Sequence, residues 1–132
     1  LHGAVDDIWK LENGELIVVD YKATSKNDKV NINAPWQRGY KRQIEFYQWL
    51  LRQNGFKVSN TGYFVYCNGR RDLDTFNGRV EFDVDLLPYD GSDDWVENTI
   101  EKIVACLNQD NIPEANENCE QCKYNQEVNQ YY

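Results

Sequence analysis

An apolar run that ends in two opposite charges is the feature that most constrains how this chain folds. Residues 16–19 read Leu-Ile-Val-Val, and Asp20 and Lys22 follow directly. Side chains alternate between the two faces of a strand, so Asp20 and Lys22 share one face while Tyr21 points to the other. One interpretation is a surface ion pair where the strand leaves the core. The other is a functional site, which needs partners from elsewhere in the chain.

A β-hairpin supplies one such partner. Two strands are predicted at residues 5–11 and 15–22, with a short loop between them that contains Asn-Gly. A two-residue turn would place Asp7 opposite Asp20. A three-residue turn, with its glycine in the left-handed conformation, would place Asp6 opposite Asp20. With either turn, an acid lies across the ladder from Asp20.

The rest of the chain alternates between helical and extended patterns. After a polar loop, apolar residues at helical spacing predict a helix over 36–54, with a stripe made of Tyr40, Ile44, Tyr47 and Leu51. Strands are predicted at 61–67 and 78–87. This order predicts one α/β domain over residues 1–132, a mixed sheet flanked by helices.

The C-terminal part reads differently. A last helix is predicted over 93–109, with an inward stripe made of Val96, Ile100, Ile103 and Leu107. Residues 113–132 read as a polar tail of the same domain without a clear element. No run of about 18 apolar residues and no charged-then-apolar leader occurs, so we expect a soluble, cytoplasmic protein without a membrane partner.

The charge balance limits the classes of function. The net charge is −8, with 22 acidic against 14 basic residues. Affinity for DNA comes mainly from Lys and Arg that neutralise phosphates, which counts against a simple DNA-binding module. It counts less against an enzyme whose carboxylates hold a divalent cation. Basic residues are also concentrated after the Asp20 strand, in a stretch that is a candidate for facing phosphates: Lys22, Lys26, Lys29, Arg38, Lys41, Arg42 and Arg52.

The four cysteines do not complete a metal site. Cys119 and Cys122 have metal-ligand spacing, but a zinc site or an iron–sulfur cluster needs two more ligands. We therefore expect neither zinc nor an iron–sulfur cluster there. Cys67 and Cys106 are expected to be buried as small apolar residues.

Two opposed carboxylates with a lysine on the same face suit phosphodiester hydrolysis. Carboxylate oxygens bind Mg²⁺, which prefers hard oxygen ligands and keeps several waters. A cation activates water and offsets the charge that builds on the phosphate, while a neighbouring lysine stabilises the transition state.

Three short motifs resemble a known family. Gly3-Ala4-Val5-Asp6, Asp20-Tyr21-Lys22 and the helical stretch that begins at Gln43 and reaches Tyr47 resemble its G-x-x-D, D-x-K and Q-x-x-x-Y series. They occur in the order of the RecB-like branch of the PD-(D/E)XK nuclease superfamily, within residues 3–47.

The resemblance implies a restriction-endonuclease-like fold and a DNA nuclease, such as an exonuclease, that acts in DNA repair, recombination or phage DNA processing. It implies Mg²⁺ or Mn²⁺ held by Asp6, Asp20 and the Tyr21 carbonyl. It also makes Lys22 the catalytic lysine, with Gln43 and Tyr47 shaping the site, and favours Asp6 over Asp7. Family members usually carry a further helix before the first motif, so such a helix and other domains or subunits of a larger protein are expected.

Two other functions fit the same residues. One is a catalytically inactive domain of this fold that binds DNA or serves in assembly. The other is an unrelated acidic α/β protein that binds a small ligand, with Asp20 and Lys22 as a surface ion pair. Metal titration and DNA cleavage separate these alternatives.

Overall fold

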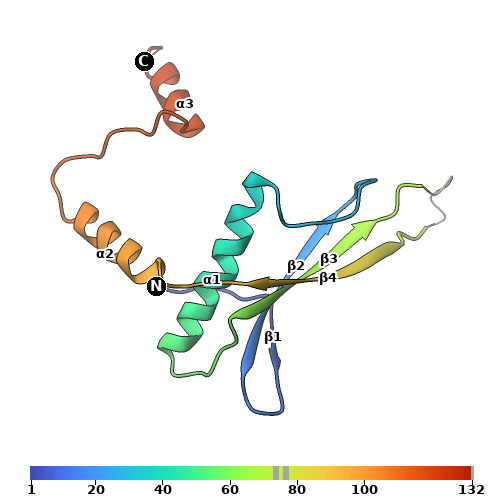
Figure 1. Ribbon diagram of the computed structural model, residues 1–132. Coiled ribbons are helices and arrows are strands. Elements are labelled where there is room, and N and C mark those ends of the chain that lie inside the picture. Colours follow the sequence, from blue (N-terminus) through green and yellow to red (C-terminus); the bar gives the residue numbers. More distant parts are fainter. Residues whose placement is uncertain (73–74, 76–77, 132) are drawn as a thin grey trace. The chain divides into compact units, whose positions relative to one another are not determined.

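The computed structural model describes residues 1–72, 75 and 78–131 (Figure 1). Its strands are β1 (Asp7–Lys10), β2 (Leu16–Thr24), β3 (Thr61–Gly69) and β4 (Phe82–Asp90). A short 3₁₀ helix, η1 (Pro35–Gln37), precedes α1 (Arg38–Gln53), and α2 (Val96–Leu107) and α3 (Glu120–Val128) follow the last strand. Residues 1–96 and 97–132 form two compact units, and the sheet and α1 lie in the first. No helix in the described part of the chain has the length and apolar character needed to cross a bilayer.

The strands form one mixed sheet of four strands in the order β1-β2-β3-β4. The β1–β2 and β3–β4 pairs are antiparallel, whereas β2 and β3 are parallel. Parallel neighbours need a long crossover, and the segment that contains α1 supplies it. The predicted α/β fold with a mixed sheet is therefore confirmed.

One face of the sheet packs against α1. Val18 of β2 and Phe64 of β3 are fully buried there beside Ile44 of α1, in a core that also includes Val30, Val58 and Tyr66. The remaining residues of the predicted helix stripe, Tyr40, Tyr47 and Leu51, pack against this core. The same face of β2 carries Asp20 and Lys22, so α1 covers the strand end that bears the charged pair.

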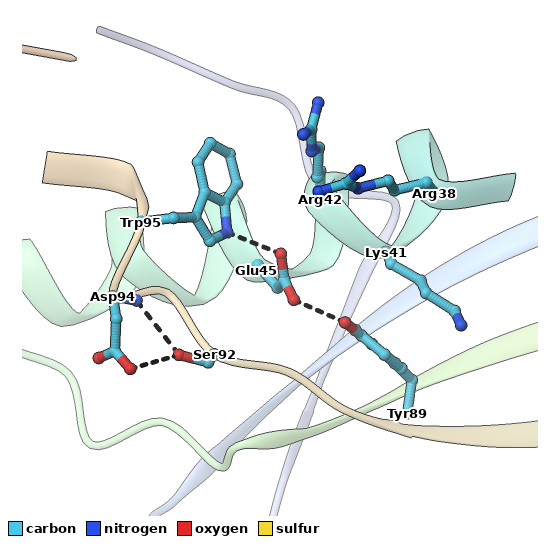
Figure 2. A pocket seen from close by; sticks show the side chains of 8 residues that line it. All are labelled: Arg38, Lys41, Arg42, Glu45, Tyr89, Ser92, Asp94 and Trp95. Carbon is cyan, nitrogen blue, oxygen red and sulfur yellow. Dashed lines mark hydrogen bonds between the residues drawn. The ribbon is translucent and has the colours of Figure 1, made fainter. Parts of the chain in front are cut away.

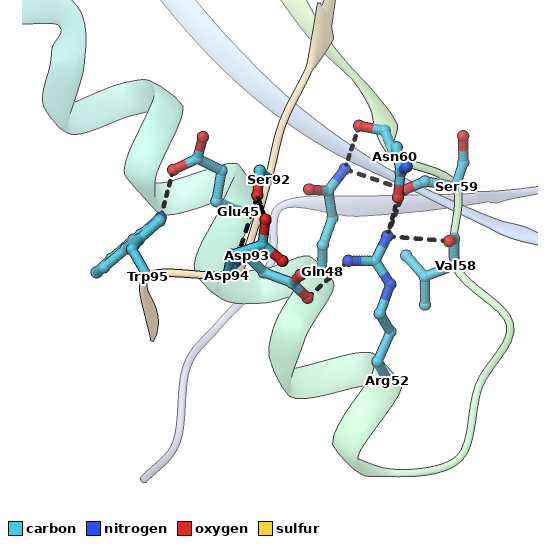
Figure 3. A network of polar contacts seen from close by, with 10 residues as sticks. All are labelled: Glu45, Gln48, Arg52, Val58, Ser59, Asn60, Ser92, Asp93, Asp94 and Trp95. Carbon is cyan, nitrogen blue, oxygen red and sulfur yellow. Dashed lines mark hydrogen bonds and ion pairs between the residues drawn. The ribbon is translucent and has the colours of Figure 1, made fainter. Parts of the chain in front are cut away.

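Polar side chains of α1 also form hydrogen bonds with the loop before β3 (Figure 3). Gln48, fully buried, donates from Nε2 to the carbonyl oxygens of Ser59 (3.0 Å) and Asn60 (2.9 Å). Arg52 donates to the Asn60 side chain at 2.7 Å and pairs with Asp93 at 2.6 Å. Arg52 thus has a structural role, unlike most of the basic stretch to which it belongs.

Replacing Gln48 with leucine is expected to destabilise the protein by about 1–3 kcal/mol. The change keeps the side-chain size but removes the two hydrogen bonds from this buried side chain to the loop before β3. Urea unfolding of the variant measures the loss. Gln53→Leu on the exposed side of the same helix is the matched control and should change stability little. Equal effects of the two substitutions would show that the Gln48 bonds add nothing specific.

The structure corrects several boundaries and burial predictions. β4 begins at Phe82 rather than at residue 78, and it continues through Pro88, which an edge strand tolerates. Ile103 and Leu107 of α2 are 52% and 78% exposed, so the second half of the stripe predicted to face inward is not buried. Val96, at the start of that helix, is buried as expected.

The cysteine-bearing segments also differ from expectation. The tail after Pro113, which showed no clear element in the sequence, contains helix α3. The sulfur of Cys119 caps that helix by accepting a hydrogen bond from the Cys122 backbone N–H at 3.3 Å. Cys67 and Cys106 are partly exposed rather than buried, because each lies on a face that neighbouring side chains cover only in part.

Candidate active site

The hairpin turn sets which acid faces Asp20. Leu11 donates its backbone N–H to the Glu15 carbonyl at 2.9 Å, and Gly14 has φ +82°, a conformation that glycine adopts without strain. This is the three-residue turn. The ladder pairs Asp7 with Val19, so Asp6, immediately before β1, lies across from Asp20. Of the two turns compatible with the sequence, the structure has the one that brings Asp6 to the site.

Backbone and side-chain contacts tie Asp6 to the end of β2. Its Oδ2 accepts a hydrogen bond from the Tyr21 backbone N–H at 3.0 Å. The Asp6 side chain is exposed, while Asp20 is 1% exposed. One carboxylate therefore faces solvent and the other lies beneath it in the protein.

Asp20 is a buried acid with an incomplete set of partners. The Lys22 Nζ lies 2.5 Å from Asp20 Oδ2 and forms an ion pair with it. Asp20 Oδ1 accepts no hydrogen bond from the described residues. Burial raises the pKa of Asp20; Lys22 opposes this rise and the nearby Asp6 carboxylate adds to it. A buried pair with an unsatisfied oxygen is not the surface ion pair that the motif alone allowed.

Helix α1 completes the surroundings of Lys22. The Lys22 Nζ donates to Gln43 Oε1 at 3.4 Å and lies 4.4 Å from the centre of the Tyr40 ring. Gln43 in turn donates from Nε2 to Tyr47 Oη at 3.3 Å. A continuous chain of contacts thus joins Asp20 to Tyr47 through Lys22 and Gln43.

The glycine of the first motif has a packing role. A Cβ atom on Gly3 would lie 2.7 Å from Tyr47 Cε1, closer than such atoms approach. The segment before β1 therefore passes directly over the Tyr47 ring, which requires a residue without a side chain. This contact brings the first and third motifs together, although more than 40 residues separate them in the sequence.

Asp7 and the Tyr21 side chain belong to the other face of the hairpin. Asp7 Oδ2 accepts hydrogen bonds from Tyr21 Oη at 2.9 Å and Trp9 Nε1 at 3.1 Å. The hydrogen bond from Tyr21 lowers the pKa of Asp7 most, followed by that from the Ile8 backbone. The Asp7 oxygens are thus engaged away from Asp20. The Tyr21 carbonyl as a metal ligand stays a prediction.

Tyr40 is the residue near the site that the sequence reasoning missed. It was placed in the core stripe, and its ring does pack against the core, but it also lies under the Lys22 ammonium. The signal was available, because Tyr40 precedes Gln43 by three residues and so shares its helix face. Trp36 packs edge-on against Tyr40, with ring centres 5.6 Å apart.

The donor set fits a hard divalent cation that keeps several waters. No group of three or more His, Cys, Asp or Glu side chains suited to hold a metal occurs among the residues that the structure describes. Two opposed carboxylates are present, and Asp20 Oδ1 is a buried acceptor without a donor. Mg²⁺ needs only one or two protein carboxylates because water and phosphate oxygens fill its other positions. Asp6 and Asp20 would hold such an ion.

The two aspartates of the hairpin are expected to change stability with pH in opposite directions when a chelator removes metal. The pKa of Asp20 is raised from 3.8, so its stabilising contribution is present at low pH and is lost as pH rises through its folded-state pKa. The pKa of Asp7 is lowered from 3.8, so its contribution is present above that value and is lost as pH falls through its folded-state pKa.

Thermal melting across pH measures both contributions, with Asp20→Asn and Asp7→Asn as the comparison variants. Each variant should remove only its own part of the pH dependence, because an amide does not titrate in this range. The assignment fails if the Asp20 variant keeps the parental pH profile above 3.8.

Comparison with known proteins supports the resemblance. A family model described as the PD-(D/E)XK nuclease superfamily matches residues 1–126. No curated protein and no solved structure matches the chain significantly.

Proposed function

The chain belongs to the PD-(D/E)XK nuclease superfamily, and from this premise we propose that it is a DNA nuclease of the RecB-like branch that depends on Mg²⁺ or Mn²⁺. The superfamily implies a phosphodiesterase with a nucleic-acid substrate. The observation that carries the proposal is the convergence of Asp6, Asp20 and Lys22 at the covered end of the hairpin. An acid pair and a lysine in one place are the groups that phosphodiester hydrolysis needs.

The aspartates have the role of holding the cation. Asp6 and Asp20, together with the Tyr21 carbonyl, would bind the cation. When bound, the cation acts as a Lewis acid on the phosphate and offsets the charge of the reacting group. Asp20 supplies a carboxylate that burial makes costly to keep charged, so binding a cation there relieves an existing electrostatic penalty.

Lys22 has one donor left for the substrate. An ammonium group carries three N–H donors. One N–H donor is directed at Asp20 and a second at Gln43, which leaves the third for a phosphate oxygen or the attacking water. Gln43 and Tyr47 keep this ammonium in place, and the Tyr40 ring shields it from water on one side. Lys22 would thus stabilise negative charge as it develops in the transition state.

Cleavage of end-labelled and internally labelled DNA tests the proposal. Single-stranded and duplex substrates are incubated with Mg²⁺, with Mn²⁺ and with a chelator. We expect cleavage that requires the cation, and the products from the two label positions distinguish an exonuclease from an endonuclease. Binding of DNA without cleavage under any cation would instead identify an inactive module of the same fold.

A further inference from the structure

A pocket lies on the side of α1 that faces away from the residues assigned to the catalytic centre. It has a volume of about 450 Å³ and lies between α1, the end of β4 and the segment that precedes α2 (Figure 2). Arg38, Lys41 and Arg42 contribute three cations to its lining, and Glu45, Tyr89 and Trp95 form part of its wall. Asp94 is a second acid of the lining, and its Oδ2 accepts a hydrogen bond from Ser92 Oγ at 2.6 Å. None of the residues assigned to the catalytic centre lines it.

The three cations are not neutralised by the protein. Among the described residues, Arg38, Lys41 and Arg42 form no side-chain hydrogen bond and no ion pair. Other arginines are paired, Arg52 with Asp93 and Arg70 with Asp72. In a chain with net charge −8, acids are abundant, so three neighbouring cations without an acid partner are available to an external anion.

Aromatic rings hold two of these cations at the pocket. The Lys41 ammonium lies 5.4 Å from the centre of the Tyr89 ring, and the Arg42 guanidinium lies 5.7 Å from that of Trp95. Cation–π attraction at these distances orients the charged groups without neutralising them.

Glu45 fixes those rings in place. It is 9% exposed and accepts hydrogen bonds from Tyr89 Oη at 2.6 Å and from Trp95 Nε1 at 2.7 Å. Burial, followed by the interaction with Glu45, raises the pKa of Tyr89 to about 12, so Tyr89 remains a donor at physiological pH. Figure 2 shows Glu45 between these two donors, while the side chain of Arg42 extends away from it. Its carboxylate is therefore engaged with the pocket wall and forms no ion pair with the cations.

We propose that this pocket binds a non-scissile phosphate of the nucleic-acid strand on which the catalytic centre acts. The inference rests on the proposed function and adds a path for the substrate. Arg42 and Gln43 are consecutive on α1, and consecutive helix residues point in directions about 100° apart. The helix thus presents the catalytic side chains on one side and the basic pocket on the other. A strand that crosses α1 contacts both, and the pocket fixes its position relative to Lys22.

The double variant Arg38→Gln/Arg42→Gln tests this path. Affinity for a fluorescently labelled oligonucleotide, single-stranded or duplex, is measured by anisotropy in chelator over a range of salt concentrations. Each lost phosphate contact makes the dependence of log affinity on log salt shallower by about 0.7 for a single strand and 0.9 for duplex DNA. Because the pocket holds one phosphate, we expect a change of about 0.7 to 0.9 for the double variant, with affinity about 10-fold or more weaker at low salt.

The variant Lys10→Gln/Lys57→Gln is the matched control. It removes the same amount of charge from two exposed lysines of the same unit that do not line the pocket. The control should keep the parental affinity and salt dependence. Equal losses of affinity in the two double variants would show that the effect comes from net charge alone. An unchanged affinity in the pocket variant would show that the pocket does not contact the strand. Either result overturns the proposal.

Competition and cleavage give two further readouts. Inorganic phosphate and a mononucleotide should displace the oligonucleotide only at far higher concentration, because they occupy one subsite of an extended path. If either competes as well as an unlabelled oligonucleotide, the pocket takes a small phosphate compound and the strand path is wrong. Binding in chelator does not require activity, so a parental protein that binds but never cleaves contradicts the proposed nuclease function and leaves the pocket inference intact.

Discussion

Replacing Asp20 with asparagine is expected to abolish divalent-metal binding and DNA cleavage together. The amide keeps the shape of the carboxylate but lacks the charge that holds a hard cation. Asp20 is 1% exposed, so solvent cannot easily replace the missing ligand. Residues that only orient a metal ligand change affinity by about 10- to 100-fold, and loss of the ligand itself should exceed that range.

Calorimetric titration with Mg²⁺ and Mn²⁺ measures the binding, and cleavage of labelled DNA measures the activity. Asp7→Asn is the control, because Asp7 lies on the same hairpin but is engaged by Tyr21 and Trp9 on the other face. It should keep both properties. Parental Mn²⁺ affinity in the Asp20 variant would remove Asp20 from the metal site.

Replacing Lys22 with alanine is expected to separate binding from chemistry. Metal affinity should stay near the parental value or increase, because the ammonium 2.5 Å from Asp20 competes with a cation for the same carboxylate. Turnover should fall about 100-fold or more, by analogy with removal of one donor from an oxyanion site. Single-turnover cleavage with saturating metal measures this effect.

Lys26→Ala is the matched control for Lys22. It removes the same charge from the same basic stretch, just beyond the end of β2, where the side chain forms no ion pair with a described residue. Both variants are compared in the full-length protein. If the Lys22 variant cleaves DNA at the parental rate in Mg²⁺ and in Mn²⁺, Lys22 is only the ion-pair partner of Asp20.

The elements of the first unit were largely predictable because their signals are local. The apolar run of β2 appears in the structure as a buried strand segment, and the helical spacing of Ile44 and Leu51 appears as the helix face that packs on the core. The segment after Gly91 was less predictable. The spacing of Ile103 and Leu107 predicts a helix, which is present, but spacing alone cannot say whether another surface covers the apolar stripe.

The site was predictable in its residues and less so in its geometry. The spacing of Asp20 and Lys22 places them on one strand face whatever the fold, and the family motifs added Gln43 and Tyr47. The role of Gly3 as the position where the chain crosses the Tyr47 ring could not be inferred, because the two residues meet only when the N-terminal segment lies against α1. The contact of Tyr40 with Lys22 could not be inferred for a similar reason, because the same ring packs against the core and lies under the Lys22 ammonium.

The sequence by itself determined the strand that ends in Asp20 and Lys22, the hairpin before it and the helix after it, because alternation, turn residues and helical periodicity act between near neighbours. The hairpin turn fixed that Asp6 rather than Asp7 faces Asp20, and the tertiary structure alone decided that the charged pair is buried under α1. It also decided that Arg38 and Arg42 line a pocket while Arg52 fastens a loop. Burial and the partner of a charge depend on residues far apart in the chain, which come together only when α1 packs on the sheet.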